Sequence, residues 1–192
     1  AETVPHPVEL ESSPIEQETF SKEKAAQREL ALRALSRKYM LPFVERFNPD
    51  YMAGWVHKDI CQRLEKFSED VKKKKSPRLM LFMPPRHGKS TLASVTFPAW
   101  HLGKNPNHEF IGCSYSGSLA MSFSRKVRQL LRDPNYKNVF SDTFLDRTSQ
   151  SVESWLTTQG GGYVAAGVGG GITGKGAHVL VIDDPVKNRE DA

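Results

Sequence analysis

The sequence predicts an α/β domain with a mainly parallel sheet flanked by helices, preceded by an N-terminal helical segment. Short apolar runs typical of buried strands alternate with stretches of helical period, and strands that alternate with helices usually pair in parallel. The length of 192 residues suits one compact domain with a tail. We place the tail and helical segment at residues 1–48 and the domain at residues 49–192.

The N-terminal part is predicted to become helical after an irregular beginning. Residues 1–15 are acidic and Pro-rich, which is not typical of a signal peptide, and we expect them to be disordered. From Ile15 to Met40, strong helix formers predict one long helix or two short ones, and Pro42 and Pro49 interrupt the stretch beyond Met40. In Trp55–Phe67 the apolar residues recur on one helical face.

The rest of the chain alternates between predicted strands and helices. In chain order we expect a strand at Arg78–Met83, a helix at Ser90–His101 that Pro98 would break or kink, a strand at His108–Tyr115, a helix at Ser116–Asp133, a hairpin with a glycine turn at Gln159–Gly162, and a strand at His178–Asp184.

Composition and charge exclude some classes of protein and leave others open. No apolar run approaches the roughly 20 residues of a membrane helix. The two cysteines, Cys61 and Cys113, have no metal-type spacing and are expected to be reduced, buried thiols. The net charge of +5 fits either a polyanionic partner or simply a soluble basic protein. Likewise, the lysine run Lys72–Lys75 fits a solvated loop or a DNA contact.

The tripeptide Gly88-Lys89-Ser90 is the most informative motif. The pattern GK[ST] is weak by itself, but here it follows a predicted strand and opens a predicted helix. That arrangement directs the free N–H groups of a helix N-terminus at a phosphate. In such a site Gly88 lets the backbone approach the phosphates, Lys89 neutralises the β- and γ-oxygens, and the Ser90 hydroxyl coordinates Mg²⁺.

The glycine that often opens such a loop is missing. Met83 stands five residues before Gly88 and is followed by two prolines, which fix φ and have no N–H. We therefore expect the later residues to bind the phosphates, with Arg86 adding a fixed charge. These residues are Arg86, His87, Gly88, Lys89, Ser90 and Thr91.

The strand that ends in Asp183-Asp184 supplies a second polar group. Ligands of parallel sheets bind at the carboxyl ends of the strands, so Lys89 and these aspartates are expected at the same edge. Asp183 would hold Mg²⁺ through a water, and Asp184 would face the γ-phosphate and orient the attacking water. The alternative is a core strand that ends in an Asx turn.

The glycine-rich stretch Gly167–Val179 is not a dinucleotide fingerprint, because it precedes a strand instead of following one. Two interpretations remain open. The stretch is either a flexible exit from the hairpin or a loop that passes close to a nucleotide or DNA and exposes Lys175.

These motifs together resemble the ATPase domain of the phage large terminase subunit, the motor that packages viral DNA. The resemblance rests on "LMLFMPPRHGKSTLAS", "FPAWHLGKNPN", "SYSGSLAMSFSRKVRQLL", "GVGGGITGKGAHVLVIDDP" and the helix "WVHKDICQRLE". It covers about residues 49–191. The family's phosphate loop characteristically lacks the first glycine, so Met83 agrees with it.

The resemblance implies a P-loop NTPase fold of the ASCE, RecA-like type, and an ATP hydrolase that uses Mg²⁺ to drive double-stranded DNA into a procapsid. Lys89 and Ser90 would be the Walker A pair and Asp183 the Walker B aspartate. Asp184 would be the catalytic carboxylate, one methylene shorter than the glutamate found in many terminases. An arginine finger would act on the neighbouring subunit's nucleotide; Arg128 is the candidate, then Arg125, with Arg86 as the alternative. The region around Trp55 and His57 would lie near the adenine.

The resemblance also implies partners and a location. The partners would be DNA, the portal protein, the small terminase subunit and further copies of the chain in a ring, without a membrane, in the host cytoplasm on the procapsid. The family's coupling motif and its nuclease domain have no counterpart in these 192 residues, so we expect an incomplete ATPase domain with weak or no activity alone. The competing hypotheses are a P-loop kinase or other phosphotransferase, and a non-catalytic nucleotide-binding assembly module.

Overall fold

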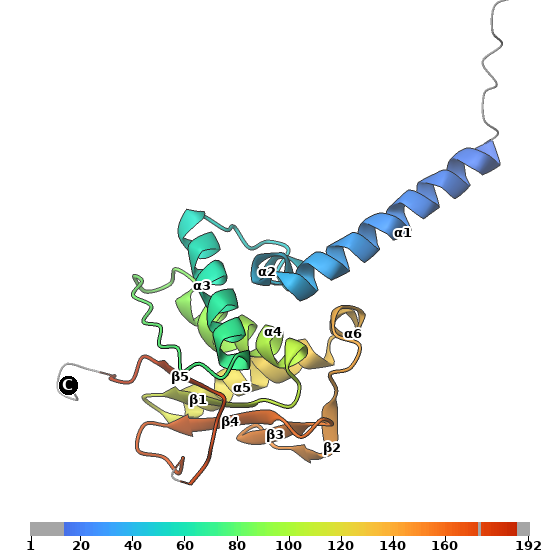
Figure 1. The fold of residues 1–192 in the computed structure, drawn as a ribbon. Coiled ribbons are helices and arrows are strands. Elements are labelled where there is room, and N and C mark those ends of the chain that lie inside the picture. Colours follow the sequence, from blue (N-terminus) through green and yellow to red (C-terminus); the bar gives the residue numbers. More distant parts are fainter. Residues whose placement is uncertain (1–13, 173, 188–192) are drawn as a thin grey trace, which may run out of the picture.

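One sheet with helices gathered on one side of it forms the body of the molecule (Figure 1). The computed structural model describes residues 14–172 and 174–187. Its elements are α1 (Pro14–Lys38), α2 (Met40–Phe47), α3 (Trp55–Lys72), the π-helical segment η1 (Thr91–Thr96), α4 (Phe97–Lys104), β1 (Glu109–Ser114), α5 (Gly117–Arg132), α6 (Pro134–Val139), β2 (Leu145–Gln150), β3 (Ser154–Thr157), β4 (Gly162–Gly167) and β5 (Val179–Asp183).

The sheet has five strands in the order β2-β3-β4-β1-β5. Strand β1 is central and pairs in parallel with both β4 and β5, whereas β2, β3 and β4 are joined by antiparallel pairings. The α/β class is therefore confirmed, but the sheet is mixed and not mainly parallel. The parallel part, β4-β1-β5, is the part that positions the candidate site.

The prediction of a strand at Arg78–Met83 is wrong. This segment is extended, and its side chains alternate as in a half-buried strand: Leu79, Leu81 and Met83 pack against the core, while Met80 and Phe82 are 81% and 88% exposed. It joins no strand of the described sheet, in which β5 pairs only with β1. Without a neighbour to receive its hydrogen bonds, an apolar run stays an extended segment.

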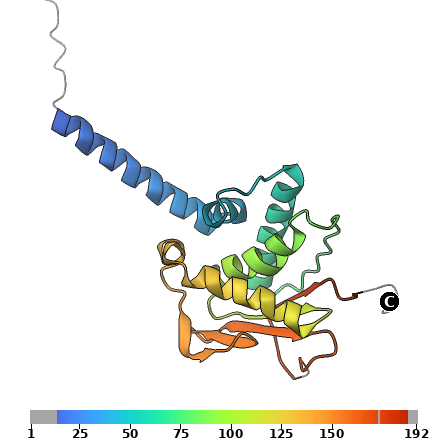
Figure 2. The same ribbon diagram turned by 180° about the vertical axis from the view of Figure 1, so that it is seen from behind.

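The N-terminal segment forms one long helix, α1, that projects from the body (Figures 1 and 2). Its last turns lie beside α2 and α6, where the Arg37 Nε donates to the Val139 carbonyl at 2.6 Å. Pro42 stands in the first turn of α2, where its missing N–H costs little. Met40, Phe43 and Val44 of α2 are fully buried in the main core. The predicted division at residue 48 stays a prediction.

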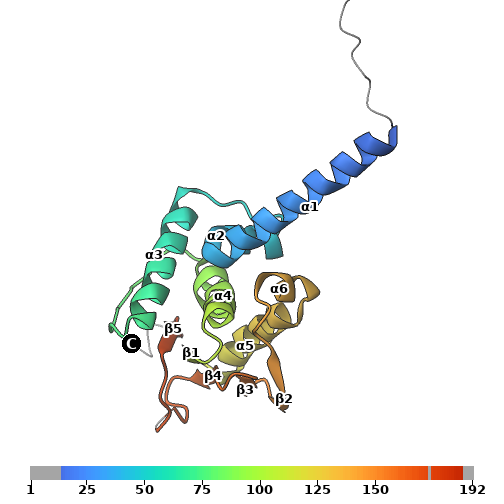
Figure 3. The ribbon, with the colours of Figure 1, turned by 45° about the vertical axis from the view of Figure 1, so that its right-hand side comes forward.

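Several elements differ from the expectations in detail. The predicted hairpin is present as β3 and β4, where the Thr157 N–H donates to the Gly161 carbonyl at 2.8 Å. The helix after the phosphate loop begins as η1 and becomes regular at Phe97, so that Pro98 stands in the first turn of α4. Strand β2 and the short helix α6 were not predicted. Seen from the side, α3, α4 and α5 stand over the same side of the sheet (Figure 3).

Candidate active site

A lysine and two carboxylates meet at the carboxyl edge of the parallel strands. The Lys89 Nζ lies 3.3 Å from an Asp183 oxygen and also pairs with Asp184. Burial by itself would lower the pKa of Lys89, but hydrogen bonds and charges of Asp184 and Asp183 outweigh it and raise that pKa. The structure thus brings Lys89 together with Asp183, the last residue of β5, and with Asp184, which follows it, as their predicted positions at the same sheet edge implied.

The two aspartates have different environments. Asp183 is 5% exposed, and its second carboxylate oxygen accepts a hydrogen bond from the Ser94 hydroxyl at 2.7 Å. Asp184 is 58% exposed and has a left-handed φ of 46°, while its carbonyl accepts from the Tyr115 N–H at 3.1 Å. Asp183 is therefore a fixed anchor at the strand end, and Asp184 presents its carboxylate at the surface of the site.

The sequence interpretation missed Ser94. A signal was present, because Ser94 follows Ser90 by four residues and a helix places such residues on the same face. Since Ser94 holds one oxygen of Asp183, it fixes the orientation of the carboxylate that also faces Lys89.

The phosphate loop contains two residues with left-handed backbone, Arg86 at φ 65° and Gly88 at φ 82°. His87 stands between them, and its Nδ1 lies 2.8 Å from the Pro85 carbonyl oxygen. Alternation of backbone hand over successive residues turns neighbouring N–H groups toward one point and forms an anion-binding concavity. Ser90 is the N-cap of η1 and makes no capping bond with its side chain, and Thr91 is exposed at the first position of η1.

Two aromatic residues, Tyr51 before α3 and His57 in its first turn, lie against this loop, and His57 binds it. The Gly54 N–H donates to the His57 Nδ1 at 2.9 Å, so the proton of the neutral ring is on Nε2, which donates to the His87 carbonyl at 3.0 Å. The Tyr51 ring packs edge-on against His57 at 5.5 Å, and its hydroxyl would lie 3.1 Å from a Cβ added to Gly88. Gly88 is thus required for space as well as for φ.

The donors of the site fit Mg²⁺ only in company with a phosphate. No group of three or more His, Cys, Asp or Glu in residues 14–172 and 174–187 could hold a metal. Asp183 and the Ser90 hydroxyl are oxygen donors of the kind Mg²⁺ prefers, and Mg²⁺ is usually bound by one or two carboxylates together with substrate phosphates. The residues present therefore fit a metal that arrives with a nucleotide.

The predicted arginine finger lies away from Lys89 and the two aspartates. Arg128 is on α5, about 16 Å along the helix from its N-terminus at the carboxyl edge. Burial first, then the charges of Arg132 and Arg125, lower the pKa of Arg128, so these three arginines form a cluster on α5. Trp55 is 80% exposed at the start of α3.

The glycine-rich stretch connects β4 to β5 and includes residue 173, which lies outside the described residues. Its first glycine, Gly167, packs against the backbone of Gly117, because a Cβ at Gly167 would meet the Gly117 nitrogen at 2.7 Å. Lys175 is exposed. Contact of this loop with nucleotide or DNA stays a prediction.

Both cysteines are buried and free, in agreement with the sequence. Burial, followed by the charges of Glu65 and Glu45, raises the pKa of the Cys61 thiol to about 12. Within residues 14–172 and 174–187, no helix has both the length and the apolar character needed to span a bilayer.

The comparison with protein families matches residues 80–192 to the family described as terminase large subunit, T4likevirus-type, N-terminal. The match covers more than half of the chain and includes the segment Arg86–Thr91 that the sequence predicts to bind phosphate, the β1–α5 unit, and β5 with Asp183 and Asp184 at its end. The α/β fold and the edge site are compatible with such a domain. The chain therefore belongs to the family of T4-like large terminase subunits, in their N-terminal part, and has a role in phage DNA packaging. Searches of curated proteins and of solved structures returned no match.

Proposed function

We propose that this chain is the ATPase domain of a DNA-packaging motor, which binds ATP with Mg²⁺ at the Lys89 edge and hydrolyses it to move double-stranded DNA into a procapsid. The observation that carries the proposal is the meeting of Lys89 with Asp183 and Asp184, which are more than ninety residues apart in the chain but lie within ion-pair distance. Membership of the terminase family supports the same conclusion.

In this proposal the triphosphate lies in the concavity formed by Arg86–Gly88 and at the start of η1. Lys89 then exchanges its carboxylate partners for the β- and γ-phosphates, which carry more negative charge. Asp183 and Ser90 would hold the Mg²⁺ that accompanies the nucleotide, which would neutralise charge on the phosphates. Asp184, released from Lys89, orients the water that attacks the γ-phosphorus while the bond to the β,γ-bridging oxygen breaks.

We further propose an arginine of α5 as the group that acts on a neighbouring subunit's nucleotide. Arg128 is distant from its own Lys89 edge along α5, so a role in the same active site would need Arg86 instead. Assembly as a homo-oligomeric ring on the portal, with the small terminase subunit and DNA, in the host cytoplasm, belongs to the same proposal. The assignment of the fold to the RecA-like class of P-loop NTPases is also part of this proposal.

The experiment measures Mg-ATP binding by this chain and by Lys89→Ala, Asp183→Asn and Asp184→Asn, and it measures hydrolysis in a longer, turnover-competent chain with the same substitutions. Lys89→Ala is expected to weaken Mg-ATP binding at least tenfold, because it removes the cation of the loop. Asp184→Asn is expected to bind Mg-ATP like the parent and to lose hydrolysis, measured with and without duplex DNA.

Lys73→Ala is the matched control, because Lys73 is an exposed lysine at the end of α3. Equal Mg-ATP affinity of Lys89→Ala and the parent would contradict the proposal. Binding without any DNA stimulation in a turnover-competent chain would instead favour a phosphotransferase. For the arginine, mixing Arg128→Ala with Lys89→Ala should restore turnover if the arginine acts between subunits.

A further inference from the structure

A cavity lies between the end of α5, α6 and β2, at the edge of the sheet opposite β5. Its volume is about 500 Å³, within the range of ligand-binding pockets. Its lining includes three cations, Arg132, Lys137 and Arg147, and three apolar side chains, Leu131, Phe144 and Leu145. We call it the cationic pocket.

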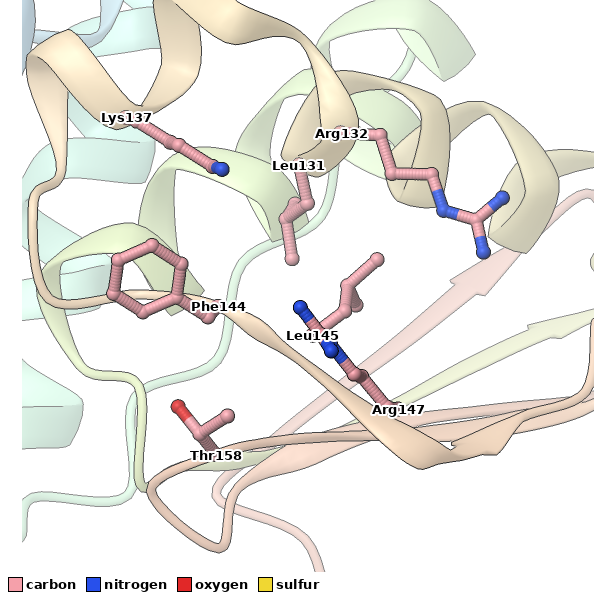
Figure 4. Close-up of a pocket in the computed structure, with 7 residues that line it drawn as sticks. All are labelled: Leu131, Arg132, Lys137, Phe144, Leu145, Arg147 and Thr158. Carbon is pink, nitrogen blue, oxygen red and sulfur yellow. The ribbon is translucent and has the colours of Figure 1, made fainter.

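The charged ends of Lys137 and Arg147 point toward Leu131 and Leu145 in Figure 4. Lys137 also lies over the Phe144 ring, 5.6 Å from its centroid. No carboxylate lines the pocket among the described residues. Leu131 is only 4% exposed, and the Arg132 guanidinium points away from the other labelled side chains in Figure 4. The accessible part of the pocket therefore combines the apolar surface of Phe144 and Leu145 with the charges of Lys137 and Arg147, and a ligand that matches it must carry both an apolar group and negative charge.

This combination favours an acidic peptide over duplex DNA. A DNA backbone offers phosphates in a regular row and presents no apolar side chain that could cover Leu145 and Phe144. A peptide in which apolar residues alternate with glutamates can place one kind of side chain on the apolar surface and the other beside the two cations. Phe144 is 41% exposed and would gain cover from such a ligand.

The chain itself contains such a peptide. Residues 1–16 carry four glutamates and no lysine or arginine, and the stretch Val8-Glu9-Leu10-Glu11 alternates apolar and acidic residues. Its charge is opposite to that of the pocket, so attraction between the two is expected at moderate ionic strength.

The length of the segment that precedes α1 decides whether the peptide comes from the same molecule or from another copy. Helix α1 has 25 residues and is therefore about 37 Å long, and its C-terminal end lies against α6 beside the pocket. In one molecule, the stretch Val8–Glu11 begins only six residues before Pro14, so its fully extended reach of about 21 Å is shorter than the helix that it would have to run back along. A neighbouring copy has no such constraint.

We propose that the cationic pocket binds the acidic N-terminal segment, residues 1–16, of a second copy of this chain. The contact links copies head to tail, since the segment and the pocket are different surfaces of the molecule. It does not depend on nucleotide binding at the Lys89 edge.

The test titrates a fluorescein-labelled peptide of residues 1–16 with the whole chain and follows fluorescence anisotropy. The pocket variant is Lys137→Glu with Arg147→Glu, which reverses two exposed charges. It is expected to weaken peptide binding at least tenfold. A peptide with Glu9→Lys and Glu11→Lys is expected to bind the parent weakly and the pocket variant well. The milder pair Lys137→Gln with Arg147→Gln serves if charge reversal disturbs folding, as judged by circular dichroism.

The matched control is Lys73→Glu with Arg78→Glu, which makes the same change of charge at two exposed positions that do not line the pocket. It should bind the peptide within twofold of the parent. Absence of peptide binding, equal losses in both variants, or no recovery with the reversed peptide would overturn the proposal. A larger loss of duplex DNA binding than of peptide binding in the pocket variant would also overturn it, in favour of a nucleic-acid site. Sedimentation equilibrium should show weaker self-association of the pocket variant than of the control.

Discussion

The buried hydrogen bond between Ser94 and Asp183 gives a sharp test of how the site is built. Replacing Ser94 with alanine removes the only side-chain hydroxyl seen to donate to Asp183 among the described residues, at 2.7 Å. Both side chains are buried, with Ser94 3% and Asp183 5% exposed. One carboxylate oxygen then keeps Lys89, while the other loses its donor in a place with little access to water.

A hydrogen bond to a charged group contributes about 1.5–3 kcal/mol, so Ser94→Ala is expected to lower the free energy of unfolding by about 2 kcal/mol. For a chain of this size, 1 kcal/mol corresponds to a shift in Tm of about 2–4 °C. Thermal and urea denaturation at pH 7 should therefore show a Tm lower by about 4–8 °C and an unchanged m-value.

The control is Ser141→Ala, which removes the same kind of contact in an exposed place. The Ser141 hydroxyl lies 3.2 Å from an Asp142 oxygen, and both residues are at the surface. Its loss should change stability by less than about 0.5 kcal/mol. If Ser94→Ala were no more destabilising than Ser141→Ala, the assignment of Asp183 as a fixed anchor would be refuted.

Three further predictions concern the loop and the core. Burial, then the charges of His108, His178 and Lys104, lower the pKa of His101 to about 3. Because only the unfolded chain binds this proton between about pH 6.5 and pH 3, the free energy of unfolding should fall by about 2 kcal/mol from pH 7 to 5. Urea denaturation of His101→Gln should show a smaller fall over the same pH range. Gly88→Ala should cost about 1–2 kcal/mol for its left-handed φ plus contact with Tyr51, so calorimetry should find it more destabilising than Gly169→Ala, which has φ 81° and open space. His57→Ala frees the His87 carbonyl and should speed amide hydrogen exchange at residues 88–91; unchanged exchange would show that His57 does not hold the loop.

Strong periodicity made most of the fold predictable. The strands around β1 and β5 were expected from apolar runs, the hairpin β3–β4 from its glycine turn, α1 from its helix formers, and α3 and α5 from apolar residues on one helical face. Strand β2, with the sequence LDRTSQ, was missed because it has no alternation of apolar residues and exists through its antiparallel pairing with β3. Helix α6 was missed because six residues are too few to show a period; the Asp133 side chain caps it and Pro134 begins it.

The segment before the phosphate loop failed for a different reason. The apolar run Arg78–Met83 has the composition and the alternating burial of a strand, and composition is all that the sequence provides. Strand formation also requires a hydrogen-bonding neighbour. In the described part of the chain, β5 pairs only with β1. Residues 78–83 therefore have a strand-like sequence but no strand beside them to pair with.

The site was more predictable than its supports. Lys89, Asp183 and Asp184 were expected together because strand ends share an edge. Ser94, Tyr51 and His57 act through contacts between segments that are not adjacent in the chain. No rule of local sequence fixes which of many serines or tyrosines makes such a contact.

The phosphate loop explains how Met83 can replace a glycine. Arg86 and Gly88, three and five residues after Met83, have left-handed backbone, and backbone of this kind can turn neighbouring N–H groups toward an anion. The strand-like segment up to Met83 can then keep ordinary backbone geometry. A left-handed arginine costs about 1–2 kcal/mol, and such strained non-glycine residues persist where the surroundings hold them, often at functional sites. Here His57 holds the carbonyl of the intervening His87. The loss of one glycine is thus compensated by a strained arginine and a histidine contact, and the arginine adds a positive charge beside the expected phosphates.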